Sequence, residues 1–289
     1  MVAVALDDYW EEHGQFTASA STTKRNITTL KHHLKLEYVS ALTPARMKKY
    51  ERERETTNAA INRELGILTA ALNHEFMEGR LNSVPKIKKL LPHKPRQGYL
   101  NDKQLDRLMD CCASEHVKAF IMIARHTGAR PGAIESLKWF QVDFKKRVIY
   151  FTRDGKKATK KRKVDSYMTP SLYTYMKKLH AAKHTEYVLE FTPSGMDKAI
   201  PAGCTKLAFK RAAMRAKLPQ ASRYTLRHSV GTKLKQMGVS MKHGGEVLGN
   251  SAETFEKHYV KAVEADRKNT TMLLDESAQL VRKSQRGKK

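Results

Sequence analysis

The sequence lacks the features of a membrane protein, of a secreted protein and of a metalloenzyme. No apolar run approaches about twenty residues and no signal-peptide h-region opens the chain, so we expect no membrane partner. The chain has only three cysteines, an odd number without metal-ligand spacing, which favours the reducing cytoplasm. Its twelve histidines form no HExxH motif, and no carboxylate cluster matches a two-metal nuclease. We therefore expect neither a metal nor another cofactor.

Acidic residues are also scarce relative to basic ones. The chain has 29 Asp and Glu against 55 Lys and Arg, a formal net charge of +26. This excess is larger than solubility requires and indicates a polyanionic partner. Since no apolar span or leader accompanies the charge, we favour nucleic acid over a membrane surface.

Composition divides the 289 residues into two domains and a linker. Residues 1–92 are predicted to be all-helical, and residues 101–289 mix helices with strand-like segments at 140–144, 148–152 and 164–168. Residues 93–100 belong to a stretch rich in proline, lysine and arginine, which is typical of a linker. The predicted fold is mainly α with a small antiparallel β-sheet.

The clearest helix of the first domain covers residues 58–78. One stripe is apolar and is expected to face the core; it consists of Ile61, Leu65, Leu68, Leu72 and Phe76. The opposite face carries polar groups that suit contacts with a DNA backbone or with base edges; they are Asn62, Arg63, Thr69 and Asn73. An ordinary solvated face is an equal alternative for any one of them.

Two arginines are predicted near helix starts in the second domain. Arg130 follows Thr127-Gly128 and precedes Pro131, a residue that favours the first position of a helix. The free N–H groups there already favour an anion. Arg227 lies near the start of a helix whose apolar positions are Leu226, Val230, Leu234 and Met237. A basic helix near residues 205–217 carries Lys210 and Arg211, which we expect to contact phosphates.

These segments together resemble the tyrosine recombinases, especially the phage-type integrases. The resemblance rests on T-G-A-R at 127–130, T-K-K-R at 159–162, L-R-H-S-V-G-T at 226–232, and L-G-N at 248–250 followed nine residues later by Tyr259. The segment at 61–81 resembles the core-DNA-binding domain of that family. The order and spacing of all these boxes make the resemblance specific, although each box alone is weak.

The resemblance implies a two-domain clamp on duplex DNA and a site-specific recombination reaction. Tyr259 would attack the scissile phosphorus and form a 3′-phosphotyrosyl link, while Arg130 and Arg227 bind the phosphate oxygens. Lys160 would protonate the leaving oxygen, with Lys161 as the alternative, and Arg162 is expected to contact DNA. Strand exchange would pass through a Holliday junction within a homotetramer on synapsed core sites, in the cytoplasm of a bacterial host and near its nucleoid.

Three positions depart from the family pattern. Tyr224 stands where the family usually has His or Lys, and Asn250 stands where it usually has His or Trp. Ala133 replaces an acidic residue. Tyrosine is a poor base at neutral pH, and asparagine carries no transferable proton. A catalytically weakened DNA-binding homologue is therefore the alternative function, and a relaxing topoisomerase is a third.

The resemblance also bears on partners and on the N-terminus. We expect a monomer in the absence of DNA and a cyclic tetramer on it, with room for accessory proteins that bend DNA. The segment at 272–281 is expected to dock on a neighbouring protomer. Phage integrases often carry a further N-terminal domain for arm sites; the core-binding pattern begins almost at Met1, so we expect that domain to be absent or removed.

Overall fold

The computed structural model describes residues 1–35, 37–91, 98–153 and 164–259, and the side chains as far as Glu256. The chain divides into two compact units, Met1–Pro95 and Arg96–Lys289. Each unit has its own hydrophobic core. The two units are described separately below.

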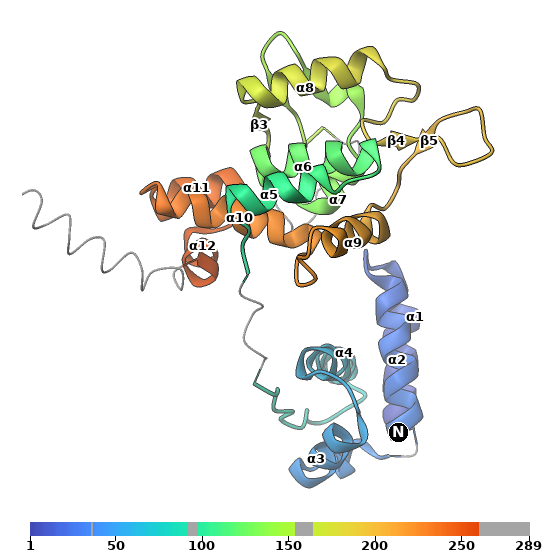
Figure 1. Ribbon diagram of the computed structural model, residues 1–289. Helices are drawn as coiled ribbons and strands as arrows, with labels where there is room; N and C mark the ends of the chain where they lie inside the picture. The colour runs from blue at the N-terminus through green and yellow to red at the C-terminus, as the bar shows by residue number, and fades with distance from the viewer. Residues whose placement is uncertain (36, 92–97, 154–163, 260–289) are drawn as a thin grey trace, which may run out of the picture. The chain divides into compact units, whose positions relative to one another are not determined.

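The first unit is a helical bundle in which α1, α2 and α4 pack against one another (Figure 1). Two helices begin with a threonine N-cap: the hydroxyl of Thr43 accepts from Arg46 N, and that of Thr57 accepts from Ala60 N. Such caps satisfy amide groups that lack an intrahelical partner. The elements are α1 (Val2–Glu12), η1 (Gly14–Phe16), α2 (Ala20–Leu34), η2 (Val39–Ala41), α3 (Pro44–Glu53) and α4 (Asn58–Met77).

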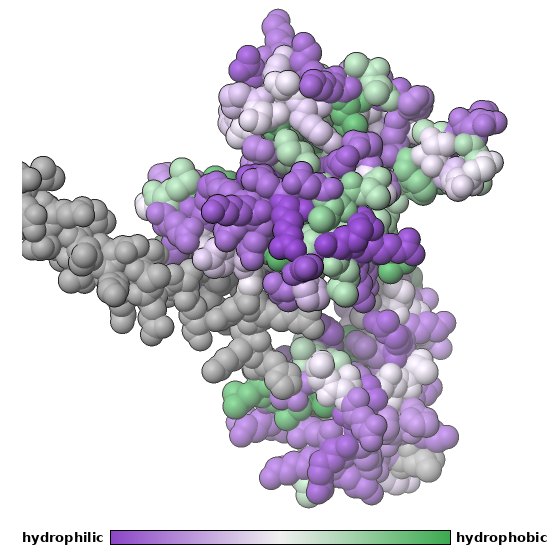
Figure 2. All heavy atoms as spheres, viewed as in Figure 1, coloured by the Kyte–Doolittle hydropathy of each residue, from purple (hydrophilic) through white to green (hydrophobic). Residues whose placement is uncertain are grey.

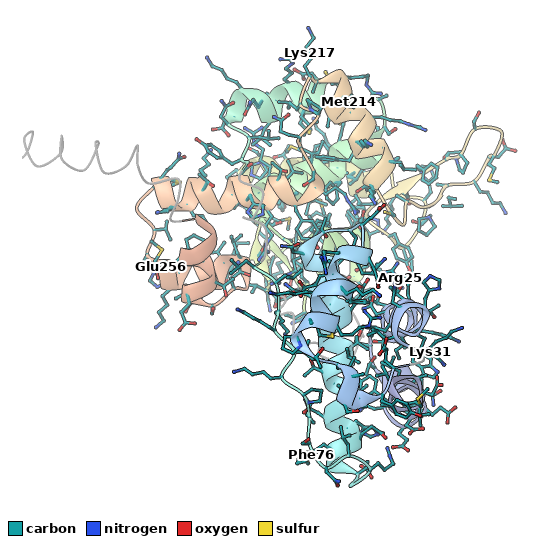
Figure 3. All side chains as sticks on the ribbon, turned by 90° about the horizontal axis from the view of Figure 1, so that it is seen from below. Arg25, Lys31, Phe76, Met214, Lys217 and Glu256 are labelled. Atoms are coloured by element: carbon teal, nitrogen blue, oxygen red, sulfur yellow. The ribbon has the colours of Figure 1, made fainter. Side chains whose placement is uncertain are left out.

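The predicted stripe of α4 is correct except at its end. Ile61, Leu65, Leu68 and Leu72 are buried, but Phe76 is 47% exposed and points away from the bundle (Figure 3). The core-facing position in that turn belongs to Glu75, which is buried and forms an ion pair with Arg80. Because a helix turns by 3.6 residues, the stripe had to pass through either residue 75 or residue 76, and this ion pair makes a charged side chain acceptable in the core.

The second unit is built around the apolar helix α6 (Glu115–Thr127), which contacts both α8 and α10 (Figure 1). Helix α5 contacts α9, and α10, α11 and α12 contact one another. The other elements are α5 (Asp102–Asp110), α7 (Pro131–Glu135), η3 (Trp139–Gln141), α8 (Pro170–Ala181), α9 (Lys206–Arg215), α10 (Arg223–Gln236), α11 (Met241–Leu248) and α12 (Ala252–Tyr259).

Two small antiparallel sheets complete the second unit. One has the order β1-β2-β3, with Val142 opposite Ile149 and Ile149 opposite Ser166; the other pairs β4 with β5. The fold is thus mainly α with small antiparallel sheets, as predicted. The strands are β1 (Val142–Asp143), β2 (Val148–Ile149), β3 (Ser166–Tyr167), β4 (Glu190–Phe191) and β5 (Ile200–Pro201).

Several elements predicted from the sequence of the second unit are shorter in the structure. The strands are two residues each, because Phe140 lies in a 3₁₀ turn and Thr152 instead binds the Asp165 carboxylate. Helix α7 begins at Pro131, as predicted, and already ends at Glu135. Met237, expected in the core, is 69% exposed because it caps the end of α10. Within the described residues, no helix is both long and apolar enough to span a membrane.

A buried carboxylate links α3 to α4 in the first unit. Glu64 accepts hydrogen bonds from Tyr50 Oη at 2.7 Å and from two nitrogens of Arg54 at 2.7 and 3.1 Å. Burial raises the pKa of Glu64, but the hydrogen bonds from Arg54 and Tyr50 outweigh burial, so the pKa lies below the ordinary 4.5. The ionised carboxylate is therefore the form that stabilises the fold.

We expect Glu64→Gln to lower the free energy of unfolding of the first unit by about 2 kcal/mol, since charged hydrogen bonds are lost while Arg54 stays partly buried. Because the folded pKa is depressed, this contribution is present above the ordinary carboxyl pKa and is lost as the pH falls through the folded pKa. Urea unfolding, monitored by hydrogen exchange of the amides in α3 and α4, measures the loss, and its repetition over a series of pH values measures the pH dependence. The exposed Glu55→Gln is the matched control, and equal losses in the two variants would contradict the assignment.

Candidate functional site

Arg227 lies in α10, and its buried guanidinium holds the ends of two other helices. Its Nη1 donates to the carbonyl oxygen of Gly128 at 2.8 Å, and its Nη2 donates to that of Leu248. Gly128 is the C-cap of α6, and Leu248 is the last residue of α11. The last carbonyls of a helix lack intrahelical partners and form the negative end of its dipole. The cation therefore satisfies orphan acceptors of both helices.

Arg130 and Asn250 complete the group. Arg130 is the N-cap of α7, and its Nη2 donates to Gly249 O at 3.0 Å and to Asn250 Oδ1 at 3.3 Å. The same Asn250 oxygen accepts from Arg227 Nη2 at 3.0 Å. Asn250 follows Gly249, which caps α11 in the left-handed conformation. One neutral amide oxygen thus binds both guanidiniums.

The two arginines line a cavity of about 200 Å³. Tyr224, in the first turn of α10, also lines it and is 54% exposed. Ala133 lies in its wall, at the position where the family pattern has an acidic residue. None of the described lining residues is acidic, and two of them are arginines. Such a cavity suits an anion with several oxygen acceptors, such as a phosphodiester.

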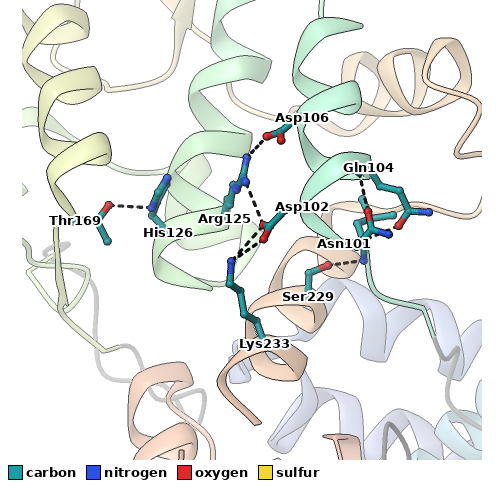
Figure 4. Close-up of polar contacts among 10 residues, drawn as sticks. Asn101, Asp102, Gln104, Asp106, Arg125, His126, Thr169, Ser229 and Lys233 are labelled. Carbon is teal, nitrogen blue, oxygen red and sulfur yellow. Dashed lines mark hydrogen bonds and ion pairs between the residues drawn. The ribbon is translucent and has the colours of Figure 1, made fainter. Parts of the chain in front are cut away.

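The start of the second unit fixes α10 against α6 (Figure 4). Leu100 N donates to Ser229 Oγ at 2.8 Å, only two residues after Arg227. Asp102 pairs with Lys233 of α10 at 2.9 Å and with Arg125 of α6 at 3.1 Å. These contacts hold α10 near α6 at positions two and six residues after Arg227.

The remaining catalytic candidates lie outside this geometry. Tyr259 ends α12, and the position of its side chain is not described. Lys160, Lys161 and Arg162 lie outside the described residues, and so does the segment at 272–281. The structure brings together Arg130, Tyr224, Arg227 and Asn250, and the roles of the other residues stay predictions.

The polar face of α4 divides into residues with structural partners and exposed residues. The amide of Asn62 both donates to Leu90 O and accepts from Leu90 N at 2.8 Å, which holds the segment after α4 against the bundle. The Thr69 hydroxyl donates to Leu65 O within its own helix. Arg63 and Asn73 are exposed. The latter pair is the better placed for contact with a duplex.

Helix α9 presents a basic exposed face. Lys210 and Arg211 are exposed on it, and Met214 and Lys217 point outward near its C-terminal end (Figure 3). Hydrophilic side chains predominate on the visible face of this unit (Figure 2). This surface is separate from the cavity wall and suits contacts with a phosphate backbone.

Sequence analysis missed the carbonyl acceptors of the two arginines, and it missed a carboxylate that binds Thr205 and Arg223. Gly128, Leu248 and Gly249 act through their carbonyl oxygens, which no residue type reveals; the only signal was a glycine at the end of each helix. Glu135 was also missed. It bonds to Thr205 and Arg223, residues about 70 and 88 positions away, so no local pattern could indicate it.

Comparison with known proteins identifies the family. The model of the phage integrase family matches residues 98–265, more than half of the chain. The chain belongs to the phage integrase family. A XerC-like tyrosine recombinase of Caldanaerobacter subterraneus subsp. tengcongensis is 24% identical over 224 residues, which are 64% of this chain and 57% of that protein. The chain thus spans a little over half the length of this curated relative.

Solved structures of other integrases share the fold. The Tn1549 transposon integrase, residues 82–397 in complex with circular intermediate DNA, superposes with a TM-score of 0.73 at 15% identity, covering 89% of this chain and 94% of that one. A lambda integrase (75–356) dimer bound to a COC' core site superposes with a TM-score of 0.65 at 16% identity, covering 86% of this chain and 94% of that one.

Among the described residues of the chain, no group of three His, Cys, Asp or Glu side chains is arranged to hold a metal.

We expect Gly128→Ala to lower the free energy of unfolding of the second unit by at least about 2 kcal/mol. Gly128 has φ +62°, and an added Cβ would lie 2.4 Å from Leu248 Cδ2. Urea unfolding measures the loss. Gly132→Ala is the matched control, since its Cβ would meet nothing within 4 Å. If both variants unfold at the same denaturant concentration, the close approach of the ends of α6 and α11 is wrong.

Proposed function

We propose that the chain is a site-specific DNA recombinase that cuts and rejoins duplex DNA through a 3′-phosphotyrosyl intermediate. The observation that carries this proposal is the convergence of Arg130 and Arg227 on one cavity without an acidic group among its described lining residues. Membership of the phage integrase family supports the reaction class. The DNA in the solved complexes of the Tn1549 and lambda integrases supports double-stranded DNA as the substrate.

In the proposed reaction Tyr259 releases its phenolic proton to water, and its oxygen attacks the scissile phosphorus. A new O–P bond forms, and the bond from phosphorus to the 5′-oxygen breaks. Lys160, or Lys161 in its place, gives a proton to the departing oxygen. Attack of a 5′-hydroxyl on the phosphotyrosine reverses the steps, so the bond energy is conserved and rejoining needs no ATP.

The two guanidiniums would stabilise the charge that develops on the phosphate oxygens. Each such preorganised donor typically contributes about 10²–10³-fold in rate. The carbonyl groups of Gly128, Leu248 and Gly249 hold the guanidiniums before DNA arrives, so little reorganisation is needed. Tyr224 is exposed at the cavity and would donate a hydrogen bond to the phosphate.

The proposed assembly is a monomer in solution and a homotetramer on two synapsed core sites. The first unit would bind the core-type sequence with Arg63 and Asn73, and α9 of the second unit would bind the backbone. A clamp formed by both units around the duplex, aided by accessory proteins that bend DNA, would bring the strands together for exchange through a Holliday junction.

A DNA-binding homologue with weakened chemistry is the second candidate. The observation in its favour is that the Asn250 oxygen accepts from both arginines, where a proton-carrying His would otherwise stand. This candidate predicts duplex binding without a covalent product under any condition.

A nicked suicide duplex that carries the core site tests the proposal. We expect wild-type protein to form a covalent adduct that persists through denaturing electrophoresis. Tyr259→Phe should abolish the adduct with unchanged duplex affinity, and Arg227→Lys should slow it at least about 10²-fold, because a lysine cannot replace two guanidinium hydrogen bonds. The core site is found by sequencing the junctions of the element that encodes the chain.

Persistence of the adduct in Tyr259→Phe would contradict the assignment of the nucleophile. Wild-type binding without any adduct would favour the weakened homologue, and relaxation of plasmids that lack the site would favour a topoisomerase.

The basic face of α9 is tested by the salt dependence of duplex binding. Each phosphate contact contributes about 0.9 to the slope of log K against log salt concentration, so Lys210→Gln and Arg211→Gln should each reduce the slope by about one. Lys178→Gln, an exposed lysine of α8, is the matched control. Slopes that are equal in all three variants would place the DNA on another surface.

A further inference from the structure

A half-buried carboxylate joins the two helices that carry the arginines to the start of α9. Glu135 is the last residue of α7, five positions after Arg130. Its Oε1 accepts from Thr205 N at 2.7 Å and from Thr205 Oγ1 at 2.8 Å, and it pairs with Arg223 Nη1. Thr205 is the N-cap of α9, and Arg223 is the first residue of α10. The side chains of Glu135 and Arg223 are only 12% and 18% exposed.

The electrostatics at the start of α10 favour a carboxylate beside Arg223. The N-terminus of a helix carries partial positive charge, which disfavours a cation such as Arg223 there. The next residue is Tyr224, and Arg227 follows in the second turn, so residues 223–227 of α10 include two cations, and a third, Arg130, lines the same cavity as Arg227. The charge of Glu135, paired with Arg223, offsets part of this positive charge. Because Glu135 does not line the cavity, it leaves the positive charge of the cavity wall in place.

We infer that Glu135 is a positioning residue for strand cleavage, which acts through Arg223 to set the first turn of α10 and with it Tyr224 and Arg227. The family pattern has an acidic residue at position 133, and Glu135, two residues further along the chain, supplies a carboxylate in its place. This carboxylate orients α10, the helix that carries Arg227. This inference rests on the proposed function.

Four variants test the inference: Glu135→Gln, Arg223→Gln, the double variant, and Glu186→Gln as the control. Glu186 forms an exposed surface pair with Lys138 in the same unit. The rate of adduct formation is measured on the suicide duplex at saturating DNA, at a temperature where every variant is fully folded. Duplex affinity is measured separately, and hydrogen exchange follows the amides of residues 222–228 in the protein without DNA.

We expect Glu135→Gln to slow adduct formation by about tenfold to a hundredfold, because small displacements of reacting groups cost rates of this order. Duplex affinity should change by less than about threefold, and the first turn of α10 should exchange faster. The double variant should be no slower than the slower single variant, since the pair acts as one unit. Glu186→Gln should behave as wild type.

A rate for Glu135→Gln within about twofold of wild type would overturn the inference, and so would additive losses in the double variant. A loss of affinity in proportion to the loss of rate would assign Glu135 to DNA binding and would overturn it as well. Absence of an adduct with the wild type would instead overturn the proposed function. In that case hydrogen exchange still tests the link between Glu135 and the first turn of α10. Unchanged exchange at residues 222–228 in Glu135→Gln contradicts the inference, and faster exchange supports it.

Discussion

The hydrogen bonds from the buried Arg227 guanidinium to two helix ends are the interaction on which the site depends. They join the end of α6 to the end of α11 through one side chain of α10. A buried cation without partners is costly, and carbonyl groups at helix C-termini provide partners that carry only partial negative charge. These carbonyl groups hold the arginine in place, and none of them carries a full negative charge.

The same principle explains why an amide stands between the two arginines. A carboxylate in the place of Asn250 would position both guanidiniums equally well, but it would cancel one of the two charges. The neutral Asn250 oxygen binds both at 3.0 and 3.3 Å and leaves the net charge unchanged. Glu135 is not among the lining residues of the cavity and pairs with Arg223 at the start of α10. Negative charge therefore supports the scaffold, while positive charge faces the cavity.

Local signals predicted the fold better than they predicted the partners within the site. The start of α7 at Pro131, directly after Arg130, follows from a rule that involves neighbouring residues only, the preference of proline for the first position of a helix. The contacts of Arg227, Asn62 and Glu135 join residues 21 to 99 positions apart, so they depend on packing that no local pattern contains. The strands were predicted too long because β-branched and aromatic residues at 140–152 also suit a 3₁₀ turn and a side-chain bond to Asp165.

A structure of the protein on a core-site duplex with an uncleavable scissile phosphodiester tests the central claim most directly. We predict that one phosphate occupies the cavity, with its non-bridging oxygens within about 3 Å of guanidinium nitrogens of both Arg130 and Arg227. A bound duplex that leaves this cavity without a phosphate, with both arginines still held by Asn250, would contradict the account.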